Sequence, residues 1–228
     1  MKQEKLIPTC IKETFERRGK TLKEEDNNER EDFELREIQP NDESSNNQPI
    51  TTPPESEAGS EPQNSNEFTY RVDGGYPEIT NIIPSLFEVK QLKFLNYSRN
   101  GELTAINTYL YQFFVLQNDY PEIATALREI SVVEMEHFEK LGEAIVEFGG
   151  NPNLTDGRGN VWTGRNILQL RNPRDILIAN IRAEERAICE YQRSAARTQN
   201  ESLRAFFERI IEDEKNHIII FNELLGTL

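Results

Sequence analysis

The sequence predicts an all-α fold, an antiparallel four-helix bundle with a long crossover between its second and third helices. Three observations predict it: an internal repeat, apolar residues that recur every three or four positions in four segments, and short turns that join these segments in pairs. The first 67 residues lie outside the repeat and contain few large apolar residues, so we expect the bundle to begin after them.

The internal repeat defines two similar halves. Residues 102–109 and 184–191 carry Glu, Ala, Ile and Tyr at the same four offsets. Each is followed by a Glu-x-x-His motif, after 32 residues (102 to 134) in one half and 30 residues (184 to 214) in the other. At a rise of ~1.5 Å per residue, this spacing fits a helix that leaves the first glutamate, a turn, and a helix that returns to the same level. Each half is therefore predicted to be a helical hairpin.

The first hairpin is expected to comprise helices at 86–117 and 121–148. The turn at 118–121 ends in a proline and is so short that the two helices must be antiparallel neighbours. Gly149 and Gly150 then give a usual signal for the end of a helix. Because Gly101 disfavours a helix interior by about 1 kcal/mol, a local break at Asn100–Gly101 is the alternative to one continuous first helix.

The second hairpin is expected to comprise helices at 173–198 and 201–225. Asn172 can cap the third helix and Pro173 can open it. The preceding residues, 149–172, have no helical period. They can extend up to ~80 Å, which is enough to run the ~42 Å length of a 28-residue helix. They are therefore predicted to cross from one end of the bundle to the other.

The two Glu-x-x-His motifs hold both histidines of the chain. Residues three apart project from one face of a helix, so each motif can offer a carboxylate and an imidazole to one ion. A single motif of this kind is frequent on any charged helix surface. Here both lie on inward stripes, and an isolated carboxylate in an apolar core is costly unless a cation compensates it. The predicted metal ligands are Glu102, Glu134, His137, Glu184, Glu214 and His217.

This donor set predicts two iron or two manganese ions per chain. Oxygen donors dominate and nitrogen is present, which suits these metals, whereas zinc usually takes fewer ligands with more His or Cys. Glu134 and Glu214 are expected to bridge ions roughly 3.5–4 Å apart. Glu102 and Glu184 would then each bind one ion terminally.

In these motifs, over about residues 86–225, the sequence resembles the ferritin-like superfamily, which includes rubrerythrin-type proteins, bacterioferritins and manganese catalases. The chain lacks the Cys-x-x-Cys pairs of a rubredoxin-like module, and no fifth helix is expected after Leu225. The resemblance implies a homo-oligomeric oxidoreductase, a dimer or larger, that acts on H2O2 or O2 with an electron donor still to be identified. Rubrerythrin-like peroxide scavenging is the favoured activity. The alternatives are a manganese catalase, a ferroxidase for iron storage, and a non-enzymatic coat or shell-cargo protein with structural metals.

Further side chains are predicted around the ligands. Tyr109 and Tyr191 follow Glu102 and Glu184 by seven residues, so they should lie over the site, either as catalytic redox groups or as structural donors to a ligand carboxylate. In proteins of the resembled family, a carboxylate placed like Asp213 often supports a ligand histidine across the bundle. In the other half, Val133 occupies its place, so the two ions need not be equivalent. Four flanking glutamates are expected on the solvated face, with one as a possible extra ligand: Glu136, Glu139, Glu185 and Glu190.

Charge and composition divide the chain. The net charge is −14, and residues 1–68 carry 17 acidic and 9 basic side chains, which leaves −8 there and −6 in the rest. We expect a disordered acidic tail at 1–67, an extended lead-in at 68–85 and the di-metal bundle at 86–228. Nucleic acid is an unexpected partner for such a charge. No apolar run approaches the ~20 residues that span a bilayer, and the first ten residues lack the apolar core of a signal peptide, so the expected location is the cytoplasm.

Overall fold

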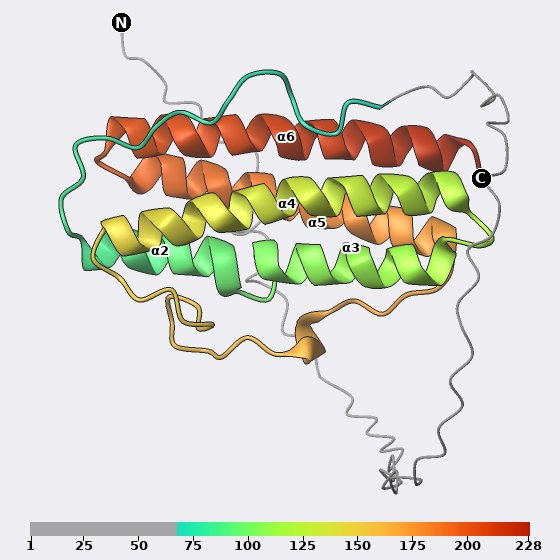
Figure 1. The fold of residues 1–228 in the computed structure, drawn as a ribbon, viewed down its shortest axis with the longest axis horizontal. Helices are drawn as coiled ribbons and strands as arrows, with labels where there is room; N and C mark the ends of the chain where they lie inside the picture. Colours follow the sequence, from blue (N-terminus) through green and yellow to red (C-terminus); the bar gives the residue numbers. More distant parts are fainter. Residues whose placement is uncertain (1–67) are drawn as a thin grey trace, which may run out of the picture. The chain divides into compact units, whose positions relative to one another are not determined.

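The computed structural model describes residues 68–228, and in this part of the chain the predicted all-α four-helix bundle is confirmed (Figure 1). The predicted tail at 1–67 lies outside the described residues. The helices are α2 (Leu86–Tyr97), α3 (Glu102–Leu116), α4 (Pro121–Glu147), α5 (Pro173–Arg197) and α6 (Glu201–Gly226), and a short 3-10 turn, η2 (Gly164–Asn166), lies in the crossover. α3 pairs with α4 and α5 with α6, as the repeat predicts.

Local sequence signals explain where these helices begin. Pro121 and Pro173 occupy the first turns of α4 and α5, where the missing N–H group is not needed. The side chains of Asn172 and Asn200 accept hydrogen bonds from the backbone of the first turns of α5 and α6. The bounds of these three helices agree with the predicted ones to within one residue at each end.

The first predicted helix, 86–117, is wrong as a continuous element, and the alternative break is found. α2 ends at Tyr97 and α3 begins at Glu102, and Figure 1 shows the two helices end to end. A Cβ atom on Gly101 would lie 2.2 Å from the carbonyl oxygen of Leu95, so only glycine fits this close approach of the chain to its own preceding turn. Glu102 is consequently the first residue of a helix rather than the middle of one.

The lead-in segment, residues 68–85, has no helix and runs antiparallel to α6. Asn216 donates to the carbonyl of Thr69 at 2.7 Å, and nearer the start of α6 Ser202 donates to the carbonyl of Thr80 at 3.0 Å. The crossover is held on α2 and α3 instead, because Tyr97 donates to the carbonyl of Pro152 at 2.8 Å and Trp162 Nε1 donates to Thr104 Oγ1 at 2.9 Å. The two long connections thus cover different helices.

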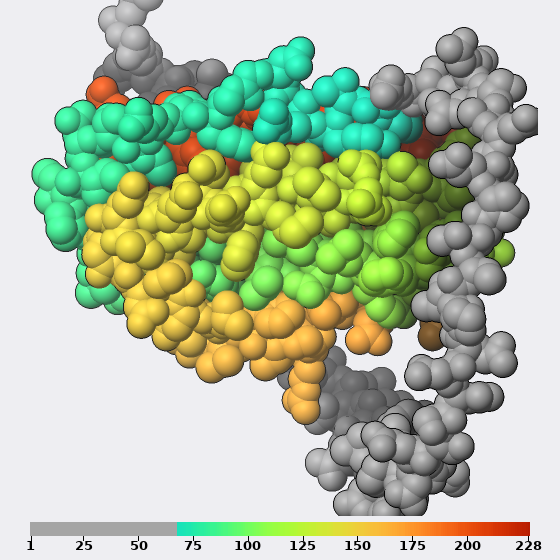
Figure 2. Space-filling view, in the orientation of Figure 1, coloured from blue at the N-terminus to red at the C-terminus, as the bar shows by residue number. Residues whose placement is uncertain are grey.

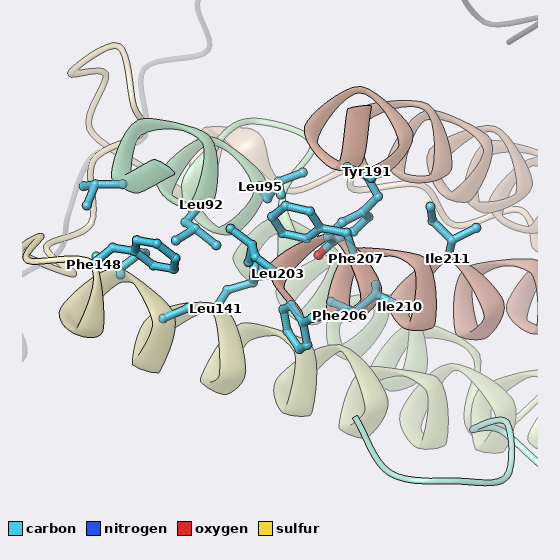
Figure 3. Packing of buried hydrophobic residues seen from close by; sticks show 14 of the residues in the cluster. Leu92, Leu95, Leu141, Phe148, Tyr191, Leu203, Phe206, Phe207, Ile210 and Ile211 are labelled. Carbon is cyan, nitrogen blue, oxygen red and sulfur yellow. The ribbon is translucent and has the colours of Figure 1, made fainter. Parts of the chain in front are cut away.

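Apolar side chains form two clusters within the bundle. Figure 3 shows the first, in which Leu92, Leu141, Tyr191 and Phe207 from four different helices converge. The second cluster includes Tyr109, Leu127, Ile176 and Phe221. Across residues 68–228, no helix combines the length and the apolar character that crossing a membrane requires.

Candidate metal centre

All six predicted ligands lie inside the bundle, and their side chains are at most 5% exposed. They come from four helices: Glu102 begins α3, Glu134 and His137 lie on α4, Glu184 lies on α5, and Glu214 and His217 lie on α6. The internal repeat thus brings together residues that are up to 115 positions apart (102 to 217).

Glu134 and Glu214 each face both histidines. Glu134 places Oε2 3.2 Å from Nδ1 of His137 and Oε1 3.1 Å from Nδ1 of His217. Glu214 places Oε1 3.5 Å from the first nitrogen and Oε2 3.3 Å from the second. One carboxylate oxygen therefore points to each histidine, which is the arrangement that a bridging carboxylate needs.

Glu102 and Glu184 each approach a single histidine. Glu102 Oε2 lies 3.9 Å from Nδ1 of His137, and Glu184 Oε1 lies 3.8 Å from Nδ1 of His217. In each half-site, four ligand atoms lie within 4.8 Å of one another, and both half-sites contain Glu134 and Glu214. The geometry is that of two neighbouring ion positions with two shared and four unshared side chains.

The chemistry of the cluster fits two divalent cations. Glu134 Oε1, both carboxylate oxygens of Glu214 and Nδ1 of His217 are buried. Although the oxygens lie 3.1–3.5 Å from histidine nitrogens, none of these four atoms makes a hydrogen bond among the described residues. Such atoms are costly to bury unless something pairs with them. Four carboxylates carry four negative charges, which two divalent ions balance. Oxygen donors with one imidazole per ion favour iron or manganese.

The sequence model of the ferritin-like domain matches residues 92–228. The chain belongs to the ferritin-like family. It is 32% identical to the bacterioferritin of Desulfovibrio desulfuricans over 141 residues, which cover 60% of this chain and 75% of that protein. It is 30% identical to the bacterioferritin of Rhodobacter capsulatus over 139 residues, 58% of this chain and 80% of that protein.

Solved structures share the fold of this chain. A structure of the Desulfovibrio desulfuricans bacterioferritin, which captures its diiron site in different catalytic states, superposes with a TM-score of 0.50 at 30% identity, covering 61% of this chain and 80% of that one. The manganese catalase KatB from Anabaena has a TM-score of 0.60 at 21% identity, covering 66% of this chain and 76% of that one. The likeness to KatB concerns the fold.

Without metal, the centre of this ferritin-like chain retains protons. Burial and the neighbouring Glu134 raise the pKa of Glu102 well above its usual range, and burial with the same neighbour raises the pKa of Glu184 to about 7. Burial lowers the pKa of His137, but hydrogen bonds with Asp213 and Glu134 outweigh it and raise the pKa to about 10. A metal ion must displace such protons before it can bind.

The two predicted tyrosines hydrogen-bond across the repeat. Tyr109 donates to Oε1 of Glu184, and Tyr191 donates to Oε1 of Glu102. Both tyrosines are 1% exposed, and each comes from the half of the repeat that does not contain its acceptor. The sequence placed them over the site but did not predict this exchange.

Asp213 reaches His137, as the family resemblance implies. Its Oδ2 lies 3.2 Å from Nε2 of His137. Its other partners are the backbone N–H of Val72 and the hydroxyl of Tyr76, each at 2.8 Å, and no pattern in the sequence indicates them. Arg209, 2.8 Å from Asp213, lies four residues before it on α6, a spacing that could have predicted the pair.

A cavity of about 150 Å³ connects the centre with the surface between α3 and α5. Its lining runs from Arg99 and Arg186 at the surface to Glu102 and Glu184. Among the flanking glutamates, Glu190 lines the cavity and pairs with Arg193 at 2.6 Å. One of the four flanking glutamates was a candidate for an extra ligand, but none of them joins either half-site: Glu136, Glu139, Glu185 and Glu190.

Proposed function

We propose that this ferritin-like protein is a dinuclear iron or manganese oxidoreductase that reduces H2O2 to water, with Glu102, Glu134, His137, Glu184, Glu214 and His217 as the ligands. The observation that carries the proposal is the paired geometry of Glu134 and Glu214, each with one oxygen toward each histidine. When bound, two such ions supply one electron each, so that H2O2, two electrons and two protons yield two water molecules. O2 is the other oxidant that such a pair can reduce.

The cavity supports a small substrate. A volume of about 150 Å³ admits a molecule of the size of H2O2 or O2 to Glu102 and Glu184. On the side of His137, Asp213 and the ring of Tyr76 cover the centre. Ions bound at the centre would face this cavity at Glu102 and Glu184, which line its inner end. The substrate thus approaches between α3 and α5.

Tyr109 and Tyr191 support the proton transfer that peroxide reduction requires. Both tyrosines line the cavity, and their hydroxyl hydrogens are held on Glu184 and Glu102. A hydroxyl in this position can pass its hydrogen to a reduced oxygen atom and recover one from solvent through the cavity that both tyrosines line. Their role in the proposal is to deliver protons, in addition to orienting the terminal glutamates.

The bacterioferritin relatives support iron as the metal and O2 as the main alternative to H2O2 as the oxidant. The Desulfovibrio desulfuricans bacterioferritin was reduced in solution and allowed to reoxidise, and its site is diiron. A ferroxidase that feeds iron storage is therefore the second candidate function for this chain. A manganese catalase and a coat or cargo protein with structural metals are the remaining alternatives. The proposal also includes assembly of the chain into a homo-oligomer.

Rapid mixing distinguishes these functions. The protein is loaded anaerobically with two Fe(II) per chain and mixed with equal concentrations of H2O2 or O2, while the absorbance of ferric iron is followed. We expect faster oxidation by H2O2. Oxidation by O2 at equal or greater speed, with iron retained far beyond two ions per chain, would establish the storage function instead.

Two further arms complete the experiment. Manganese-loaded protein that evolves O2 from H2O2 would identify a catalase, and metal that is retained but not oxidised by either reagent would identify a structural role. The matched control is the Glu134→Ala/Glu214→Ala variant, which should bind neither ion firmly and show no fast phase.

A further inference from the structure

The two histidines of the centre differ in what holds their outer ring nitrogen. Nε2 of His137 lies 3.2 Å from Oδ2 of Asp213. Nε2 of His217 is fully buried and has no hydrogen-bond partner among residues 68–228. The residue that corresponds to Asp213 in the other half is Val133, whose side chain cannot accept a hydrogen bond. The two halves of the repeat therefore supply the same predicted ligands but differ in the residue that can accept a hydrogen bond from the ligand histidine.

Asp213 is itself held by the lead-in segment. The backbone N–H of Val72 donates to Oδ1 and the hydroxyl of Tyr76 donates to Oδ2, both at 2.8 Å. Arg209 adds an ion pair to Oδ1 at 2.8 Å. Asp213 is completely buried, so these partners and His137 account for the hydrogen bonds of both its oxygens. Its orientation therefore depends on the lead-in as well as on α6.

Other contacts fix the lead-in segment at this point. The ring of Tyr76 meets the ring of His137 edge to face, with 5.6 Å between centroids, and the guanidinium of Arg209 lies 5.0 Å from the centroid of Tyr76. Arg209 also donates to the carbonyl of Val72 at 2.6 Å. Figure 2 shows the lead-in covering α6 alongside α4. The segment precedes residues 92–228, over which the ferritin-like domain is matched.

We propose that the lead-in segment, through Tyr76 and Val72, is a positioning element for the ion held by His137, and that it makes this position bind metal more tightly than the one at His217. This inference rests on the metal centre of the proposed function. When Nε2–H of His137 donates to Asp213, Nδ1 keeps its lone pair and faces Glu134 and Glu214. His217 needs the same tautomer to bind metal, and then leaves a buried N–H without a protein partner.

Single-position variants separate the two ions. Glu184→Ala removes the terminal ligand at His217 and leaves the His137 position intact, and Glu102→Ala does the reverse. Metal-free, full-length protein of each variant is titrated with Co(II), and the visible absorption of the bound ion gives the dissociation constant. Because outer partners of metal-bound histidines change affinity by about 10–100-fold, we expect Glu184→Ala to bind Co(II) at least ~10-fold more tightly than Glu102→Ala.

Tyr76→Phe then tests the lead-in. It removes the hydrogen bond to Asp213 and keeps the ring against His137. Added to Glu184→Ala it should weaken Co(II) binding several-fold, and added to Glu102→Ala it should leave binding unchanged. Tyr97→Phe is the matched control, because Tyr97 is a buried tyrosine whose hydroxyl donates to the carbonyl of Pro152 at 2.8 Å, away from the centre. Circular dichroism of each metal-free variant verifies the fold.

The outcomes are distinct. Equal affinities of the two single-position variants, or an equal effect of Tyr76→Phe in both backgrounds, would overturn the inference while leaving the metal centre in place. Wild-type protein that binds fewer than two Co(II) ions per chain would overturn the metal centre and the inference together. If Tyr76→Phe weakens Co(II) binding only in the Glu184→Ala background, Tyr76 is a positioning residue for the ion at His137.

Discussion

Tyr109 donates its hydroxyl hydrogen to Glu184, a residue that belongs to the other half of the internal repeat. Tyr191 and Glu102 form the corresponding bond in the opposite direction. Each tyrosine lies seven residues after the glutamate of its own half but donates its hydrogen bond to the glutamate of the other half. A pair of exchanged hydrogen bonds therefore joins the two halves at the centre. Because both acceptors are predicted terminal ligands, this exchange places one proposed proton donor beside each proposed ion position.

Removing the two hydroxyls should slow turnover more than it affects metal binding. General acid catalysis typically contributes about 10²–10⁴-fold to a rate, so we expect Tyr109→Phe/Tyr191→Phe to lower the rate of oxidation by H2O2 about tenfold or more. Two metal ions per chain should remain, because all six ligands are present. Rapid mixing and elemental analysis measure the two quantities. Tyr97→Phe is the control, and an unchanged rate in the double variant would limit the tyrosines to a structural role.

The shared glutamates should control both ions at once. Glu134 and Glu214 each face both histidines, whereas Glu102 faces His137 alone. We therefore expect Glu134→Ala or Glu214→Ala to lower the occupancy of both positions, and Glu102→Ala to lower mainly one. Elemental analysis of purified protein provides the measurement. Two metals per chain in the Glu134→Ala/Glu214→Ala variant would disprove the assignment of these residues as bridges.

The sequence predicted which glutamates and histidines meet at the centre because the signals for them are local and repeated. Two histidines, each three residues after a glutamate, recur in register with two further glutamates, and helical periodicity turns all of them inward. The contact of Tyr76 with Asp213 had no such signal, since 137 residues separate the two and the lead-in has no periodic pattern. The break before α3 was only an alternative, because the contact of Gly101 with Leu95 depends on the path of the backbone and not on the apolar stripe.

Replacing Gly101 by alanine, which adds only a methyl group, should destabilise the fold. The Cβ of Gly101→Ala would lie 2.2 Å from the carbonyl oxygen of Leu95, which is backbone and cannot rotate away. We expect destabilisation of about 1–3 kcal/mol, as for other overpacked sites, together with weaker binding at the His137 position, because Glu102 follows directly. Thermal unfolding and Co(II) titration test both effects. Gly164→Ala is the control, since a Cβ there meets no atom within 4 Å, and a Gly101→Ala variant as stable as this control would contradict the close approach.

The protons held by the metal-free centre should make its stability fall as pH rises. The pKa of Glu184 increases from 4.5 to about 7 on folding, and that of His137 from 6.5 to about 10. Between each pair of values the folded chain binds more protons than the unfolded chain, so the free energy of unfolding decreases with increasing pH. The raised pKa values of Glu102 and Glu214 act in the same direction, and the lowered pKa of Glu134 acts only below about pH 4.5.

We therefore expect the Tm of metal-free protein to fall by several degrees between pH 5 and pH 8. With two divalent ions bound, the fall should be smaller, because the cations replace the protons as partners of the carboxylates. Differential scanning calorimetry at constant ionic strength, with and without metal, makes the comparison. Glu184→Gln, which cannot titrate, should flatten the pH dependence of the metal-free chain. A Tm that rises from pH 5 to pH 8 in the absence of metal would show that these carboxyl groups are not protonated in the folded state.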